Sequence, residues 1–262
     1  ELHVSVVTKK ARAENLVKLL SPGEKLTGNV DNQLIITGPL ADYRLEGQLL
    51  LTDGSFRGQL IAKGEGKYVR EHGRLHLQDF TIASLNTQIA VSGTMEPDKN
   101  LNLSVSANPI DVERLHLNLP YPVKGQAKFT GKLTGTTEHP IFNGELFASQ
   151  LSINHQEFTQ ISGQVQLQGE QLDIPFFQFR QGSGLCTFRG GMDMASGEIY
   201  GGLDVQEVQV ESILPVFNVT DKGVTGRLKG HIRVAGTAKN PDIWLTGGLT
   251  QGSIKKYPLD YI

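Results

Sequence analysis

The residues best suited to chemistry are seven histidines, one cysteine and scattered acids. His72 and His76 lie four residues apart, and their imidazoles would suit a divalent metal ion. The surrounding pattern predicts a strand, in which residues four apart share a face but are separated by about 13 Å. That distance is too long for one metal ion, so we interpret both residues as surface histidines.

Three other groups also lack the pattern of a catalytic site. Cys186 is the single cysteine, which excludes an internal disulfide framework, and no Cys-His-Asn pattern frames it, so we expect a buried, small apolar residue. Asp111 and Glu113 open an expected helix, where acids suit the positive end of the dipole. The Gly-Ser-Gly run at 182–184 lacks the lysine of a phosphate loop and the spacing of a nucleophile elbow. We therefore predict no catalytic residue, metal or cofactor, and a protein that is not an enzyme.

The elements around these residues are expected to be strands. Apolar and polar residues alternate from Val123 to Leu133, which is typical of a strand with one dry and one wet face. The same alternation predicts strands at residues 2–7, 28–37, 43–51, 56–63, 75–83, 88–95, 101–107, 124–133, 143–148, 162–168, 172–179, 185–189 and 200–205. Asp53-Gly54 predicts a hairpin turn, because both residues accept a positive φ.

One pattern occurs three times, at intervals of about a hundred residues. In each copy two glycines stand ten residues apart, and a proline turn and a further alternating run follow. The copies are residues 26–49 with Gly28, Gly38 and Pro39, residues 123–146 with Gly125, Gly135 and Pro140, and residues 224–249 with Gly226, Gly236 and Pro241. We expect a repeat at 1–100, a second at 101–199 and a partial third at 200–262, all in one continuous elongated groove cut from a longer protein.

Helical spacing interrupts the strands once in each repeat. Apolar residues at i, i+3, i+4 and i+7 predict helices at residues 12–20 and 210–217. A third helix is expected from Asn108-Pro109, as cap and first-turn residue, to Leu119.

Charge and hydropathy exclude some classes of protein. The 25 basic and 27 acidic residues nearly balance, and no basic stripe suggests nucleic-acid binding. No run of 18 or more apolar residues is present, so we expect any membrane anchor outside this segment.

These patterns predict a mostly β fold, with an antiparallel sheet whose apolar face must be covered. The sheet could fill itself as a barrel or sandwich, or it could curl into a U-shaped trough that holds a ligand. A closed barrel needs a fixed strand number, whereas a trough can grow by whole repeats, so the repeat favours the trough. The candidate lining residues are the alternating apolar sets Leu101, Leu103, Val105, Phe129, Leu133, Val165, Leu167, Leu203, Val205, Ile232 and Val234.

The glycine pair with its proline turn and third glycine, preceded by a strand and a segment such as residues 108–119, resembles the repeat of the TamB family. That family supplies the inner-membrane component of the translocation and assembly module and belongs to the wider AsmA-like group of bridge-like proteins. The resemblance covers all three copies. It implies a taco-shaped β groove in the periplasm of a diderm bacterium, an anchor in the inner membrane and a TamA- or BamA-type outer-membrane barrel as partner.

The function predicted first is conduction of phospholipids, whose acyl chains would lie in the apolar groove, between the two membranes. A second hypothesis is a scaffold whose sheet edges pair with nascent strands of outer-membrane proteins, by strand addition. A charged row along an open edge would favour the first, and bare edge backbone the second. A third, a surface β-solenoid such as an adhesin, fits less well because such repeats are usually much shorter.

Overall fold

The computed structural model describes residues 1–15, 26–56, 59–84, 87–115, 122–213, 223–237, 240–254 and 257–259. Strands make up nearly all of these residues. No helix within these ranges is long and apolar enough to cross a membrane. The elements are β1 (Leu2–Arg12), β2 (Leu26–Gly38), β3 (Arg44–Phe56), β4 (Gln59–Glu71), β5 (Arg74–Ser84), β6 (Thr87–Met95), β7 (Leu101–Asp111), η1 (Val112–Leu115), β8 (Val123–Gly135), β9 (Pro140–Ile153), β10 (Gln156–Gln168), β11 (Gln171–Gln181), β12 (Gly184–Asp193), β13 (Ile199–Gln209), α2 (Val210–Ile213), β14 (Val224–Gly236), β15 (Pro241–Ile254) and β16 (Tyr257–Leu259).

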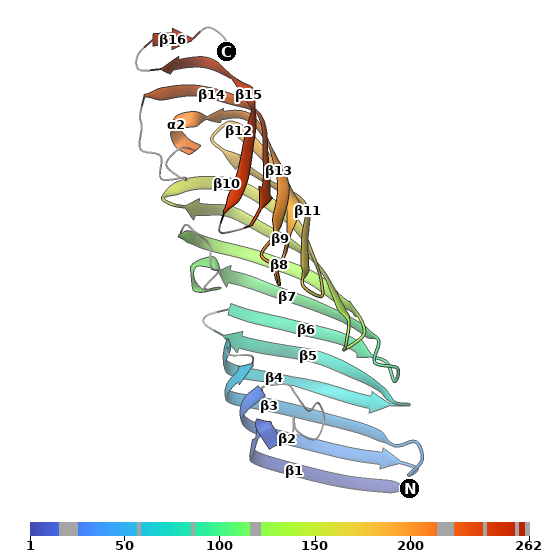
Figure 1. The fold of residues 1–262 in the computed structure, drawn as a ribbon. Coiled ribbons are helices and arrows are strands. Elements are labelled where there is room, and N and C mark those ends of the chain that lie inside the picture. The colour runs from blue at the N-terminus through green and yellow to red at the C-terminus, as the bar shows by residue number, and fades with distance from the viewer. Residues whose placement is uncertain are drawn as a thin grey trace. The chain divides into compact units, whose positions relative to one another are not determined.

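The strands follow one another in the sheet in sequence order, from β1 to β16 (Figure 1). From β1 to β7 and from β9 to β16, each strand pairs antiparallel with its neighbour. The expected mostly β, antiparallel fold is therefore confirmed.

The chain divides into two compact units. Unit 1 comprises residues 1–110 and 130–140, and unit 2 comprises residues 111–129 and 141–262. In each unit the strands have two distinct ends. At the end that we call the turn end, β2 joins β3, β4 joins β5 and β6 joins β7 in unit 1, and β10 joins β11, β12 joins β13 and β14 joins β15 in unit 2. We call the opposite end the bulge end.

The repeat seen in the sequence recurs in the strands. Its three copies become β2, β8 and β14, each 13 residues long and each ending on the second glycine of the pair. The first glycine has φ of 128° in Gly28, 126° in Gly125 and 134° in Gly226. A residue with a side chain rarely adopts this conformation, which explains why the position is glycine in every copy.

Irregular residues near the bulge end bend the strands. At each, one strand has an extra residue relative to its neighbour, and a non-glycine residue takes a φ between 51° and 55°. These bulges increase the local twist and bend of the strand. The bulge residues are Lys10 in β1, Asp53 in β3, Asp79 in β5, Gln160 in β10, Glu207 in β13 and Gln251 in β15.

The bulges correct one turn prediction and several boundaries. Asp53-Gly54 lies inside β3 and forms its bulge, so the predicted hairpin turn there is wrong. The sequence pattern alone does not distinguish the two, because a bulge and a tight turn both need a positive φ. Most observed strands run beyond the predicted ranges, and the strand predicted at 56–63 is instead the end of β3 and the start of β4.

The predicted helices lie only partly within the described residues. Residues 13–15 are helical, Arg12 belongs to β1, and the predicted continuation to residue 20 lies outside the described residues. Residues 108–111 extend β7 rather than opening a helix, and the 3₁₀ turn η1 follows; the predicted continuation from residue 116 to Leu119 lies outside the described residues. The fixed φ of Pro109 is compatible with an extended strand as well as with the first turn of a helix. The third helix is α2, and its continuation beyond residue 213 is also outside the described residues.

Buried apolar side chains gather at the bulge end in three clusters, one near each helical segment. Ala13, Val30, Leu51 and Ile61 form the cluster of unit 1. Unit 2 holds the other two. They consist of Ala127, Ala148, Leu151, Phe158 and Ile161, with Val112 packed against them, and of Cys186, Val205 and Val208.

Candidate functional site

The register of unit 1 places apolar side chains on one face of its strands, which we call the apolar face of unit 1. Residues that pair across neighbouring strands share a face, so the pairings define rows that cross the strands. Four rows run from the turn end to the bulge end. They are Val4–Ile36–Leu45–Arg70–Leu75–Met95–Leu101, Val6–Leu34–Gly47–Tyr68–Leu77–Gly93–Leu103, Thr8–Asn32–Leu49–Gly66–Phe80–Val91–Val105 and Ala11–Val30–Leu51–Gly64–Ile82–Ile89–Ala107.

Unit 2 has an equivalent apolar face. Its rows are longest where β9 to β15 pair in succession, and they contain no charged side chain among the described residues. From the turn end they are Phe142–Leu167–Leu172–Met192–Ile199, Gly144–Val165–Ile174–Gly190–Gly201–Val234–Ile243, Leu146–Gly163–Phe177–Phe188–Leu203–Ile232–Leu245 and Ala148–Ile161–Phe179–Cys186–Val205–Gly230–Gly247.

The opposite face of each unit is mostly polar. In β4 the residues between the apolar positions are Lys63, Glu65 and Lys67, and in β10 they are Gln164 and Gln166. It also carries exposed apolar side chains, such as Ile35 in unit 1 and Phe147 in unit 2. A mostly polar face of this kind is typical of a sheet with one face in water.

Exposure changes along the apolar faces. The row nearest the bulge end contains buried side chains such as Val30 at 3% and Cys186 at 0%. Toward the turn end the apolar side chains are half-buried, and on β15 Ile243 and Leu245 are 59% and 60% exposed. The turn-end half of each apolar face is thus accessible apolar surface.

The predicted lining residues can now be placed. Leu101, Leu103 and Val105 lie on the apolar face of unit 1, and Leu133 is a half-buried residue of β8 in the same unit. The remaining seven belong to unit 2: Phe129, Val165, Leu167, Leu203, Val205, Ile232 and Val234. All except Val205 are half-buried.

Val205 differs from the other ten. Its side chain is 1% exposed and packs with Cys186 and Val208, so it belongs to a core cluster rather than to accessible surface. Alternation predicted the face on which Val205 lies but not how deeply it is buried, because the bulge at Glu207 brings Val208 into the same cluster.

Aromatic rings on the apolar faces lie over glycines of the neighbouring strand. A Cβ on Gly47 would meet the ring of Tyr68, one on Gly66 the ring of Phe80, and one on Gly144 the ring of Phe129. Phe129 also stacks on Phe142, with ring centroids 5.2 Å apart. The glycines that lie beneath these rings can be seen in the sequence, but only the pairing register shows which ring each glycine meets.

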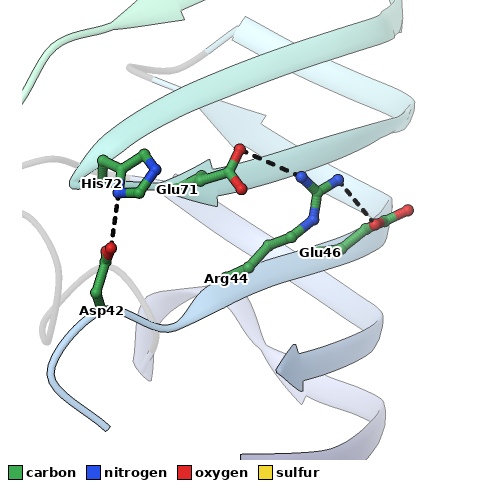
Figure 2. A network of polar contacts seen from close by, with 5 residues as sticks. All are labelled: Asp42, Arg44, Glu46, Glu71 and His72. Atoms are coloured by element: carbon green, nitrogen blue, oxygen red, sulfur yellow. Dashed lines mark hydrogen bonds and ion pairs between the residues drawn. The ribbon is translucent and has the colours of Figure 1, made fainter. Parts of the chain in front are cut away.

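Charged pairs line the turn end of unit 1, which the sequence analysis missed. Arg44 on β3 lies between two carboxylates, with Nη2 3.3 Å from Glu46 Oε2 and Nη1 3.2 Å from Glu71 Oε2 (Figure 2). His72 Nδ1 is 2.8 Å from Asp42 Oδ2. Hydrogen bonds to Glu46 and Glu71 raise the pKa of Arg44 above its ordinary value.

Two more pairs continue this set along the turns. Arg74 Nε is 2.8 Å from Glu96 Oε2, and Lys99 Nζ is 3.0 Å from Glu138 Oε1. The hydrogen bond and positive charge of Lys99 lower the pKa of Glu138. A hollow of about 460 Å³ lies among these side chains on the polar face, lined by both arginines together with His72 and His76.

Polar side chains also occur on the apolar face of unit 1, at β2 and β4. The Tyr68 hydroxyl donates to Asn32 Oδ1 at 3.0 Å. Arg70 is the only charged residue in the four rows, and its Nη1 donates to the Tyr43 hydroxyl at 3.2 Å. No carboxylate of the described residues forms an ion pair with Arg70.

The residues considered first for chemistry are accounted for. His72 and His76 are exposed, as predicted, and the described residues contain no group of three or more potential metal ligands. Cys186 is buried, as predicted, and burial raises the pKa of its thiol to about 12. Glu113 lies in η1 and pairs with Lys124 at 3.0 Å, whereas Asp111 ends β7.

Two polar contacts of unit 2 perturb other groups. A hydrogen bond to Asp173 raises the pKa of Tyr200. Backbone N–H groups of Ser196 and Ala195 donate to Asp193 in the turn before β13 and lower the pKa of its carboxyl group. The first contact links β11 to β13 across β12, and the second lies within the turn between β12 and β13.

Comparisons of this chain with protein-family models, with curated proteins and with solved structures found no match.

Proposed function

We propose that this chain is a segment of a periplasmic bridge that conducts phospholipids between the inner and outer membranes of a diderm bacterium. The acyl chains would lie in a U-shaped groove formed by the curled sheet. The observation that supports this most is the half-exposed apolar surface on one face of each unit, opposite a polar face. The resemblance to the TamB repeat points the same way and implies an inner-membrane anchor and an outer-membrane barrel partner of the TamA or BamA type.

The energetics of lipid movement require such a surface. Transfer of an acyl chain into water costs about 0.8 kcal/mol per methylene, or roughly 13 kcal/mol for a sixteen-carbon chain. Apolar rows that cross several strands would remove most of this barrier while the headgroup stays in water.

The composition of the rows also suits transport rather than storage. Toward the turn end they consist mainly of Leu, Val, Ile and glycine, with aromatic rings lying flat over glycines. Neighbouring positions therefore offer similar contacts, so no single position would hold a lipid much more tightly than the next.

The test is mass spectrometry of organic extracts from the chain, expressed in bacteria and purified without detergent. We expect co-purified phospholipid. We expect less in Leu103→Asp and Val165→Asp, because each places a charge on an apolar face. Ser104→Asp and Gln164→Asp are matched controls, since each adds the same charge to the adjacent, exposed residue of the same strand. Circular dichroism establishes that each variant is folded. Lipid-free wild type, or equal loss in the controls, would contradict the proposal.

A second function, strand addition to outer-membrane proteins, is favoured by one feature of unit 1. Among the described residues β1 pairs only with β2, and its first seven positions carry no Lys, Arg, Asp or Glu. Val4 and Val6 are 40% exposed and Val7 is 55% exposed. An uncharged, apolar edge strand is a template for a further strand.

The two functions can be separated on this edge. Val7→Lys places a charge on β1, on the face opposite the apolar rows, and we expect it to abolish strand addition. Strand addition would slow the aggregation of an unfolded outer-membrane barrel protein, so the variant should no longer slow it, whereas its lipid content should be retained. If Val7→Lys slows this aggregation as much as the wild type does, the strand-addition function is contradicted.

A further inference from the structure

We propose that Arg70, with Tyr43, binds the phosphate of an anionic phospholipid whose acyl chains lie on the apolar face of unit 1. This inference rests on the proposed function and adds headgroup selectivity to it.

Arg70 lies in an apolar row of unit 1. It pairs with Leu45 on β3 and with Leu75 on β5, so it stands in the apolar row nearest the turn end. A charged residue between two leucines on an apolar face is unfavourable unless a partner compensates it. The aliphatic stem of arginine can cover apolar surface while the guanidinium reaches water, so this residue tolerates the site and presents its charge at the rim.

Arg70 differs from the other cations of this end in having no ion-pair partner among the described residues. Arg44, Arg74 and Lys99, also at the turn end of unit 1, each form an ion pair with a glutamate. Arg70 has no such carboxylate among the described residues. It contacts the hydroxyl of Tyr43, 3.2 Å from Nη1, and the Tyr43 ring, whose centroid is 6.0 Å from Cζ.

Those contacts hold the guanidinium without neutralising it. A guanidinium has five N–H donors in a planar fork, and one of them is used by Tyr43. The remaining donors match the paired oxygens of a phosphate, which arginine binds in bidentate geometry. Tyr43 therefore acts as a positioning residue for Arg70.

The dimensions suit a lipid rather than a free phosphate. The strand from Arg70 back to Gly66, in the last row before the buried one, spans about 13 Å at about 3.3 Å per residue. Half of a bilayer's hydrocarbon core is about 15 Å thick. Acyl chains anchored by a phosphate at Arg70 thus fit along β4 and its neighbours, over Tyr68, Gly66 and the adjacent apolar residues.

The experiment measures extraction of fluorescent phospholipids from vesicles by the 262-residue chain. Phosphatidylglycerol and phosphatidylcholine with identical acyl chains are compared. We expect the wild type to bind phosphatidylglycerol about tenfold more tightly, the scale of one charge-assisted contact. Arg70→Gln should abolish this preference, and Arg70→Lys should keep part of it because the charge remains but the fork is lost.

Lys67→Gln is the matched control. Lys67 lies on the same strand with the same charge, but it belongs to the polar face, where it pairs with Gln48. Its loss should leave the preference unchanged. Glycerol 3-phosphate is the soluble headgroup control and should bind far more weakly than the whole lipid.

The outcomes separate this inference from the proposed function. Extraction of both lipids without preference, or a preference that survives Arg70→Gln, would overturn the Arg70 site and leave the lipid-conducting function standing. Binding of glycerol 3-phosphate as tight as that of the lipid would show a free-phosphate site. If the wild type extracts neither lipid, the proposed function and this inference both fail.

Discussion

In both units the two ends of the strands differ in how completely their apolar side chains are covered. At the bulge end, Phe158, Ile161 and Val208 are at most 4% exposed and pack in clusters. At the turn end, side chains of the same type remain half-buried on the same face of the sheet. The backbone explains part of this difference, because bulges bend the strands where the clusters form.

This comparison separates stability from binding. Buried apolar area is the main source of folding free energy, so the bulge end should hold each unit together. Apolar area that folding leaves accessible contributes less to stability and is available to a ligand. Variants at the two ends should therefore have different consequences.

The largest effect is expected for two matched phenylalanines of unit 2. Phe158 is 4% exposed and meets Phe179 edge to face at 5.3 Å, whereas Phe142 is half-buried near the turn end. Phe158→Ala should lower the free energy of unfolding by about 4 kcal/mol through a cavity, and Phe142→Ala by about 1–2 kcal/mol. Urea unfolding measures both. Equal losses of unfolding free energy in the two variants would contradict the proposed difference between the two ends.

Two glycines test whether the backbone contributes to the difference between the bulge end and the turn end. Gly226 has φ of 134°, and a Cβ there would lie 2.7 Å from the Cα of Gly252 near the bulge in β15. Gly226→Ala should cost about 3 kcal/mol, from strain and overlap together. Gly197, in a turn, has φ of 75° with no atom within 4 Å of that position, so Gly197→Ala should cost about 1–2 kcal/mol. Thermal unfolding of the two variants gives the difference. Similar midpoints would mean that the bulge backbone relaxes freely.

Much of the fold could be predicted from alternation and glycine spacing. Period-two patterns located the strands, and the glycine pairs marked β2, β8 and β14, because these positions need a backbone that only glycine adopts easily. Bulges could not be distinguished from turns, as Asp53 shows, since both use a positive φ. Strand ends were also missed, because pairing with a neighbour extends a strand beyond its alternating core.

The candidate site was predictable in part. Alternation assigned Leu103 and Val165 to one face, but only the register shows which glycines lie under aromatic rings. The burial of Val205 depends on the bulge at Glu207, and a bulge leaves no periodic pattern in the sequence from which it could be predicted. Arg70 was missed because it interrupts the apolar alternation near the end of a strand, where such a residue reads as part of the turn.

Cys186 provides a chemical probe of the bulge end. Burial raises its pKa to about 12, so at pH 8 only about one thiol in ten thousand is the reactive thiolate. Labelling with a maleimide should be at least about a hundredfold slower than in Cys186→Ala with Ser196→Cys, which places the thiol in an exposed turn. The same raised pKa means that the folded state holds the proton more tightly. Its contribution to stability is thus complete below the unfolded thiol pKa and is lost as the pH rises from there toward 12. Fast native labelling would show that this cluster opens.

The smallest effect is expected at the turn end, in the pair of Lys99 and Glu138. Both side chains are mostly exposed, at 62% and 68%, and exposed pairs contribute little to stability. Lys99→Met should raise the pKa of Glu138 back toward its ordinary value, measured by NMR titration of the carboxyl carbon, and leave the urea midpoint at pH 7 unchanged. Because the Glu138 pKa is lowered in the fold, any stabilisation by the pair is present above the unfolded pKa and is lost as the pH falls through the lowered one. A midpoint shift as large as that of Phe142→Ala would mean that the charged turns help to hold the fold. The separation of a stabilising bulge end from a binding turn end would then be wrong for unit 1.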